Sequence, residues 1–260
     1  MIPLMGRLVA ELTSFESSRQ LKASSTLVWP LGAIEQHGPH LPLNTDVLVA
    51  EGIARRILIR WASDFDLWQL PTVTIGLSRE HDWAAGTMSL SVQGFAGMLR
   101  ELAREIARAL PPRNLAIVNG HGGNRGILEN LLHEFWSDFG LNACVLHPFD
   151  LAAVETTAQA PDVHGGRSET SVMLALAPEL VRSALIAAPG EALDPAVIQA
   201  TIFDRGATFP WRTDDARLAR DGIIGDARGA SAELGEEIIA RIVTRAGTVL
   251  ATLLARGKQV

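Results

Sequence analysis

The sequence is poor in the residues that mark secreted and membrane proteins. Cys144 is the only cysteine among 260 residues, which excludes an intrachain disulfide and fits a reducing compartment. No uncharged apolar run reaches the length of a membrane span, and residues 1–17 lack the long apolar run of a signal peptide. We therefore expect a cytoplasmic protein that does not associate with a membrane.

A clustered basic surface is also missing from the sequence. The 23 Lys and Arg residues are interspersed with 29 Asp and Glu residues, which gives a net charge of −6. Phosphate binding needs grouped basic side chains, so we do not expect a nucleic-acid partner. The chain has no internal repeat, low-complexity stretch or convincing linker. Because 47% of its residues are apolar, we predict a single domain over residues 1–260.

Short apolar stretches alternate with amphipathic ones through the first 150 residues. Strands are predicted over 26–31, 67–75, 115–118 and 142–146. Helices are predicted over 47–61, 91–110 (with Ser91 as N-cap), 127–139, 169–177 and 232–254. Strands that alternate with helices are typical of parallel βαβ units. The predicted fold class is therefore α/β with a mostly parallel sheet.

Ionisable side chains follow the first predicted strand directly. Glu35 and His37 are two residues apart, so they point to the same side of an extended chain. Asp46 stands nine residues later, at the far end of a loop that Pro39 and Pro42 stiffen. Carboxylates and imidazoles on a rigid loop are candidate metal ligands.

Two later segments supply further candidates. His121 lies in the glycine-rich NGHGGN segment after the third predicted strand. Sites in open α/β sheets form at the carboxyl ends of strands, so we expect His121 to lie near Glu35 and His37. His164 precedes a predicted helix, and Glu169 lies in its first turn. The alternative for Glu169 is a charge that only complements the helix dipole.

The candidate ligands are imidazoles and carboxylates without a thiolate, which favours zinc, manganese, iron or cobalt. Five ligands exceed what one catalytic zinc usually takes. Two ions bridged by one carboxylate, most naturally that of Asp46, would use all five and leave room for a bridging hydroxide. We predict two divalent ions, zinc first and manganese or iron as alternatives. The predicted ligands are Glu35, His37, Asp46, His121 and Glu169.

The ordered motifs of this chain resemble those of the creatininase (creatinine amidohydrolase) family. They are EQHGPHLPLNTD, GLSREHDWAAGTMSL, NGHGGN, HGGRSETSVMLAL and GIIGDARGASAELG. The resemblance implies a single-domain three-layer sandwich with a mostly parallel sheet, two divalent metals and a homo-oligomer, commonly a hexamer. It also implies hydrolysis of a C–N bond, in creatinine, in a formamide of pyrimidine biosynthesis, or in a peptide of mycofactocin maturation.

Within this resemblance, the same five residues match the metal-ligand positions. His164 matches a histidine that is thought to act in proton transfer. Two positions depart from the true creatininases: Gly123 replaces a ligand glutamate, and Val163 replaces the glutamate before the second HGG histidine. Both departures argue against creatinine itself as the substrate.

We therefore predict a dinuclear amidohydrolase that cleaves a small-molecule, non-peptide amide, cyclic or formyl, by attack of metal-bound hydroxide. His164 would give a proton to the departing nitrogen. Glu80 and His81 are either substrate contacts or part of an exposed charged loop, and the N–H groups of Gly122 and Gly123 could hold the oxyanion. The alternatives are a peptidase of mycofactocin maturation and a catalytically silent metal-binding or assembly protein.

Overall fold

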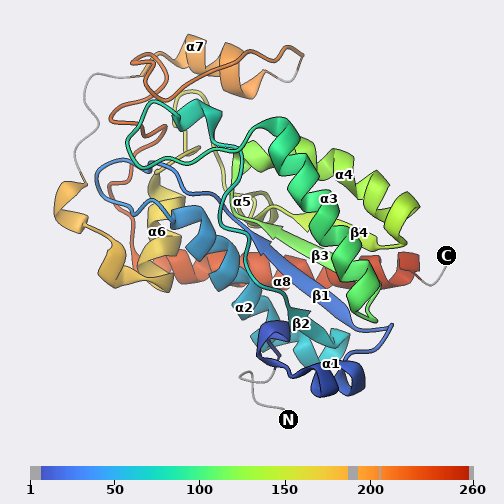
Figure 1. Cartoon of the computed structure of the whole chain (residues 1–260). Helices are drawn as coiled ribbons and strands as arrows, with labels where there is room; N and C mark the ends of the chain where they lie inside the picture. Colours follow the sequence, from blue (N-terminus) through green and yellow to red (C-terminus); the bar gives the residue numbers. More distant parts are fainter. Residues whose placement is uncertain (1–6, 187–192, 205, 258–260) are drawn as a thin grey trace.

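The computed structural model describes residues 7–186, 193–204 and 206–257. Its centre is a four-stranded sheet in the order β2-β1-β3-β4, in which every neighbouring pair is parallel (Figure 1). The strands are β1 Thr26–Leu31, β2 Leu67–Gln69, β3 Asn114–Asn119 and β4 Asn142–Leu146. The predicted α/β fold with a mostly parallel sheet is confirmed.

Helices cover both faces of this sheet, because successive side chains of a strand point to opposite faces. In β1, Leu27 and Trp29 pack in one apolar cluster and Val28 packs in the other. The first cluster lies under α3 and α4, and the second lies under α2 and α8 (Figure 1). These helices are α2 Thr45–Phe65, α3 Val92–Ala109, α4 Arg125–Phe139 and α8 Ala232–Gly257.

Shorter elements complete the described part of the chain. The remaining α-helices are α1 Ser14–Gln20, α5 Pro148–Leu151, α6 Arg167–Leu176 and α7 Pro195–Ile198, and α7 runs into a π-helical turn, Gln199–Phe203. The 3-10 turns are Val9–Glu11, η3 Arg79–His81, η4 Gly122–Asn124, Pro178–Leu180 and Ser183–Leu185. Of these, η3, η4 and α6 matter most for function, because they carry side chains to the carboxyl end of the sheet.

Helix α8 is long and apolar enough to span a membrane, judged by length and composition alone. It packs instead along α6, α2 and the sheet, and its buried face includes Ile238, Ile242 and Leu250. Its apolar side chains therefore form part of the core of the fold.

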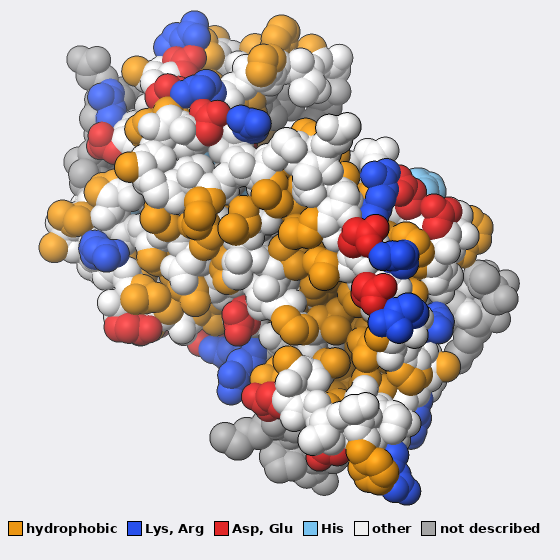
Figure 2. All heavy atoms as spheres, viewed as in Figure 1, with side chains coloured by type: hydrophobic (Ala, Val, Ile, Leu, Met, Phe, Trp, Pro, Cys, Tyr) orange, Lys and Arg blue, Asp and Glu red, His pale blue; other side chains and the backbone are white. Residues whose placement is uncertain are grey.

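Charged side chains of both signs lie close together on the face shown in Figure 2. The arginines of α3 illustrate the arrangement: Arg100 pairs with Glu134 of α4, and Arg108 pairs with Glu105 one turn earlier. Such exposed pairs are screened by water and salt, and they contribute little to stability.

The second strand is shorter than predicted: the expected strand over 67–75 ends at Gln69. The physical reason is proline. Pro30 of β1 has no N–H to donate on the side that faces β2, and Pro71 follows β2 directly. Beyond this gap, Val73 contacts β1 only through an isolated bridge, donating its N–H to the Pro30 carbonyl at 3.0 Å.

Helix α2 begins two residues before its predicted start and ends four residues after its predicted end. Asp46 therefore lies in the first turn of a helix, and the prediction that it ends a loop is wrong. The hydroxyl of Thr45 donates to the Pro42 carbonyl at 2.7 Å, which stabilises the turn into the helix. The other predicted helices differ from the observed bounds by three residues or fewer, and Ser91 caps α3 as predicted.

Candidate metal centre

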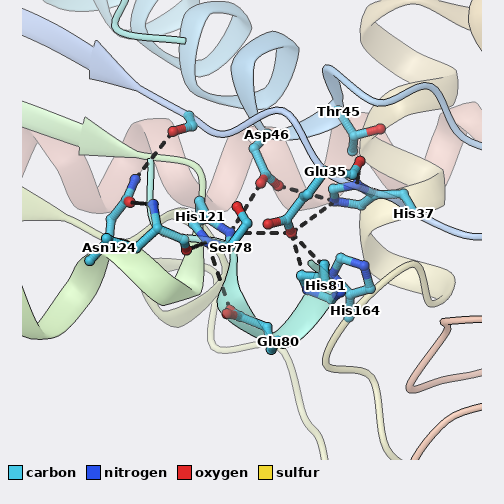
Figure 3. A network of polar contacts seen from close by, with 12 residues as sticks. Glu35, His37, Thr45, Asp46, Ser78, Glu80, His81, His121, Asn124 and His164 are labelled. Atoms are coloured by element: carbon cyan, nitrogen blue, oxygen red, sulfur yellow. Dashed lines mark hydrogen bonds and ion pairs between the residues drawn. The ribbon is translucent and has the colours of Figure 1, made fainter. Parts of the chain in front are cut away.

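The carboxyl ends of β1 and β3 bring four of the predicted ligands together (Figure 3). Glu35 and His37 follow β1, His121 follows β3, and Asp46 points in from the first turn of α2. All four side chains are buried. Parallel strands end on the same side of a sheet, so residues far apart in the sequence meet there.

The carboxylate of Asp46 lies between two imidazoles. Its Oδ1 is 3.1 Å from His37 Nε2, and its Oδ2 is 3.1 Å from His121 Nδ1. Glu169, in the first turn of α6, completes the cluster with Oε1 at 3.6 Å from His37 Nε2. Among the described residues, three sets of side chains have ligand atoms within 4.8 Å of one another: Glu35–His37–His164, Glu35–Asp46–His121 and His37–Asp46–Glu169.

Three buried carboxylate oxygens in this cluster have no hydrogen-bond partner among the residues that the structure describes. They are both oxygens of Glu35 and Oδ2 of Asp46. A buried anion without a partner is strongly unfavourable, and a cation that these oxygens bind removes the penalty. The donor set of carboxylate oxygens and imidazole nitrogens, several of them aimed at the same space, therefore fits divalent metal ions.

The electrostatics of the cluster agree with its geometry. Burial pulls the pKa of His37 down, but the carboxylates of Glu169 and Asp46 outweigh burial and raise this pKa well above its usual range. Burial, Glu35 and Asp46 act in the same way on the pKa of His121. The two imidazoles in turn hold the pKa of Asp46 below its usual range despite burial. The imidazoles of His37 and His121 thus hold protons at the positions where they could bind metal ions.

Backbone carbonyls hold both of these imidazoles. Nδ1 of His37 donates to the carbonyl of Glu35 at 3.1 Å, and Nε2 of His121 donates to the carbonyl of Leu77 at 2.5 Å. In each ring the other nitrogen then faces the carboxylates of the cluster. This is the common arrangement of metal-binding histidines, whose second N–H is fixed by an acceptor outside the coordination sphere.

The two proposed substrate contacts lie in the 3-10 turn η3 above the cluster. His81 is buried, with Nε2 at 3.3 Å from Glu35 Oε1. The Glu80 side chain is 17% exposed, with Oε1 at 3.8 Å from His121 Nε2. Burial raises the pKa of Glu80. The loop that carries these residues is therefore part of the wall of the site.

Gly123 has no room for a side chain. A Cβ built at this position would lie 2.3 Å from the Leu77 carbonyl oxygen, 2.4 Å from His121 Nε2 and 2.9 Å from Glu80 Oε1. Any side chain here would displace the carbonyl that holds His121. The carboxylate beside this position belongs to Glu80.

Two residues at the site carry no signal in the sequence, namely Gln36 and Thr213. Gln36 stands between two candidate ligands, and its amide contacts His81 Nδ1 at 2.9 Å. Thr213 comes from an irregular segment near the end of the chain, is buried, and lies with Oγ1 at 2.8 Å from the same nitrogen. Neither belongs to a periodic pattern or to a residue type that indicates a ligand, so only the fold reveals them.

Two cavities open onto the cluster. One has a volume of about 280 Å³ and is lined by Asp46, Glu169 and the side chains of α5. The other has a volume of about 630 Å³ and is lined by Glu35, Glu80 and the segment around Trp211. They share four lining residues, namely His121, Gly122, Val163 and His164. The candidate centre therefore lies where two open spaces meet.

Comparison with known proteins supports one family. The model of the Creatininase family, described as creatinine amidohydrolase, matches residues 10–250. The mycofactocin precursor peptide peptidase of Mycobacterium tuberculosis is 35% identical over 244 residues, which are 90% of this chain and 88% of that protein. Creatinine amidohydrolase of Pseudomonas putida is 31% identical over 258 residues, covering 89% of this chain and 91% of that protein.

A solved structure has the same fold. The structure named Creatininase Mn superposes with a TM-score of 0.72 and 27% sequence identity, covering 94% of this chain and 96% of the other. Fold and sequence therefore agree over nearly the whole length of both proteins.

Proposed function

The chain belongs to the creatininase family of amidohydrolases, and on that premise we propose that it hydrolyses an amide bond with the help of two divalent metal ions. The ions would be held by the five predicted ligands: Glu35, His37, Asp46, His121 and Glu169. The observation that carries the proposal is the set of buried, unpartnered oxygens of Glu35 and Asp46, faced by imidazole nitrogens.

The metals, when bound, would activate a water molecule and polarise the amide carbonyl. The chain itself would move the proton. Nε2 of His164 donates to the carbonyl of Gln36 at 2.7 Å, and its Nδ1 faces Glu35 Oε1 at 3.7 Å. Burial lowers the pKa of His164, which favours the neutral ring. The bare Nδ1 can then take a proton from the attacking water and pass it to the departing nitrogen.

We propose a peptide as the first substrate class to test. The 35% identical relative is a peptide peptidase, and the two cavities that meet at the centre offer separate space for the two sides of a scissile bond in an extended chain. The sequence-based prediction of a small non-peptide amide is the second candidate. The 31% identity to a creatinine amidohydrolase supports it, as does the smaller cavity of about 280 Å³, near the lower limit of ligand pockets.

Metal identity needs its own measurement, because oxygen and nitrogen ligands alone do not separate zinc from manganese or iron. The related structure is named Creatininase Mn, so manganese is loaded beside zinc, the ion that the sequence predicts first. The expected hexamer remains a prediction, to be checked by the mass of the protein in solution.

The proposal is tested by loading the purified protein with Zn²⁺ or Mn²⁺ and offering short peptides, formylated aminopyrimidines and cyclic amides. We expect about two ions per chain and turnover in one of these substrate classes, with metal-free protein as the matched control. Loaded protein that hydrolyses nothing in the panel would favour the catalytically silent alternative. Equal turnover without metal would overturn the metal-dependent mechanism.

A further inference from the structure

Four imidazoles surround one carboxylate oxygen at the centre (Figure 3). Oε1 of Glu35 lies 3.3 Å from both His81 Nε2 and His121 Nδ1, 3.7 Å from His164 Nδ1 and 4.0 Å from His37 Nε2. Each ring nitrogen that faces Glu35 is either a bare acceptor, suited to bind a metal, or an N–H donor. The bond made by the opposite nitrogen of the same ring decides which.

Three of the four rings have the same construction. In each, the outer nitrogen contacts a backbone carbonyl oxygen, which can only accept, so that nitrogen carries a proton. The inner nitrogen of the neutral ring is then bare and faces the cluster. The three pairs are His37 with Glu35 O, His121 with Leu77 O and His164 with Gln36 O. Nε2 of His164 lies 2.7 Å from the Gln36 carbonyl oxygen and 3.2 Å from the Gln36 side-chain nitrogen. The shorter contact is with the carbonyl, so Nε2 of His164 carries the proton.

The outer partner of His81 is different, and its own orientation is fixed. Oε1 of Gln36 accepts from the N–H of Gly38 at 2.9 Å, and Nε2 of Gln36 donates to the carbonyl of Gly222 at 2.9 Å. Backbone groups on both sides therefore determine which end of the Gln36 amide is nitrogen. An amide nitrogen can donate hydrogen bonds to its neighbours but cannot accept them.

His81 must accept from this nitrogen. Its Nδ1 lies 2.9 Å from Gln36 Nε2, a contact that is favourable only if Nδ1 is bare. A neutral ring with a bare Nδ1 carries its proton on Nε2, the nitrogen that faces Glu35.

Thr213 is compatible with the same assignment. Its hydroxyl oxygen accepts from the indole N–H of Trp83 at 3.0 Å, because that nitrogen only donates. The single hydrogen of the hydroxyl then goes to His81 Nδ1 at 2.8 Å, the nearer of its two acceptors, and not to the carbonyl of Glu80 at 3.2 Å. This donation also needs a bare Nδ1 on His81.

We propose that His81 is a positioning residue, not a metal ligand: its protonated Nε2, 3.3 Å from Glu35 Oε1 and not hydrogen-bonded to it in the metal-free fold, supplies the donor that this carboxylate takes up when it binds metal. The inference rests on the proposed metal centre. Carboxylates that bind metals are usually held by a donor outside the coordination sphere, and a neutral imidazole supplies one without adding positive charge beside a cation. His81 also stacks on His164, with ring centroids 4.1 Å apart, so the same ring limits the orientation of His164.

A matched pair of substitutions tests this assignment. In His81→Gln the side-chain amide nitrogen can take the place of Nε2, whereas in His81→Asn it takes the place of Nδ1, so the donor to Glu35 is lost. We expect His81→Asn to weaken Zn²⁺ binding by about 10–100-fold in competition with a chromophoric chelator, and His81→Gln to restore most of the affinity. His133→Asn, on the exposed side of α4, is the control and should bind Zn²⁺ like the wild type.

Equal losses in both variants would overturn the donor assignment, and so would full affinity in both. A wild-type protein that binds no Zn²⁺ would instead overturn the proposed function and the inference together. A second measurement does not depend on the variants folding. In ¹⁵N NMR of the Zn²⁺-loaded wild type, His81 should have a protonated Nε2 and an unprotonated Nδ1, and the reverse pattern would contradict the inference.

Discussion

The apolar layers on the faces of the sheet and the polar cluster at its carboxyl end are equally buried, yet different forces hold them. Phe95 of α3 and Glu35 of the cluster both have 0% of their surface exposed. Burial stabilises Phe95 by removing apolar surface from water. Burial destabilises Glu35, whose two oxygens lack hydrogen-bond partners. The comparison teaches that burial alone stabilises the scaffold, whereas the buried carboxylates of the cluster must be balanced by positive charge, either protons on the imidazoles or metal ions.

The largest effect should follow the loss of the proposed bridging carboxylate. We expect Asp46→Ala to lose metal and turnover by more than the roughly 10–100-fold that removal of an outer partner costs. Asp64→Ala, near the exposed end of the same helix, is the control. Metal content by elemental analysis and activity are measured on both. Full activity and metal load in Asp46→Ala would refute the two-metal scheme.

The second largest effect should be a loss of folding stability that leaves Zn²⁺ affinity unchanged. We expect Phe95→Ala to lower the free energy of unfolding by about 3–5 kcal/mol, because it leaves a cavity between α3 and the sheet. Urea unfolding of metal-free protein measures this, and Val92→Ala, an exposed position on the same helix, should change little. Zn²⁺ affinity of the folded Phe95→Ala variant should stay at the wild-type value. A matching loss of affinity would mean that scaffold and cluster are not separable.

The same comparison explains which parts of the molecule could be predicted from sequence. Apolar layers leave a periodic pattern, so α3 was predicted to within a residue at each end and its cap at Ser91 was correct. The edge strand β2 was too long in the prediction, because TVTI has the composition of a strand while Pro30 and Pro71 remove the donors that a ladder needs.

The cluster leaves no periodic pattern, so its residues were predicted from type and order along the chain. Glu35, His37 and His121 could be expected to meet because they follow parallel strands of one sheet. Gln36 and Thr213 could not, since an amide and a hydroxyl are common anywhere. Their roles depend on single contacts, such as the 2.8 Å approach of Thr213 Oγ1 to His81, that exist only once the chain has folded.

A third effect should distinguish the cluster by its pH dependence. The pKa values of His37 and His121 are raised in the metal-free fold, so protonated rings stabilise it below about pH 6.5, and that stabilisation is lost as pH rises through the raised pKa values. Metal binding must release both protons. We therefore expect apparent Zn²⁺ affinity to rise with pH, by up to about 100-fold per unit where both rings are protonated.

Chelator competition between pH 6 and pH 8 measures this dependence, and thermal unfolding with and without Zn²⁺ gives a second readout. The gap in melting temperature between loaded and metal-free protein should widen as pH rises. A gap that does not change with pH would show that His37 and His121 do not exchange protons for metal. Phe95→Ala, whose changed side chain does not titrate, should have the same pH dependence as the wild type.

The smallest effect concerns one hydrogen bond at the start of α3. The hydroxyl oxygen of Ser91 accepts the N–H of Gly94 at 3.0 Å and so satisfies one of the free donors in the first helical turn. Ser91→Ala should lower the free energy of unfolding by about 1 kcal/mol, whereas Ser91→Asp keeps an acceptor and should retain most of the stability. Both variants should bind Zn²⁺ like the wild type, because the cap supports only the apolar layer. A shift in Zn²⁺ affinity with Ser91→Ala would show that a change at the start of α3 reaches the candidate metal centre. The apolar layers and the polar cluster could then not be treated as energetically separate.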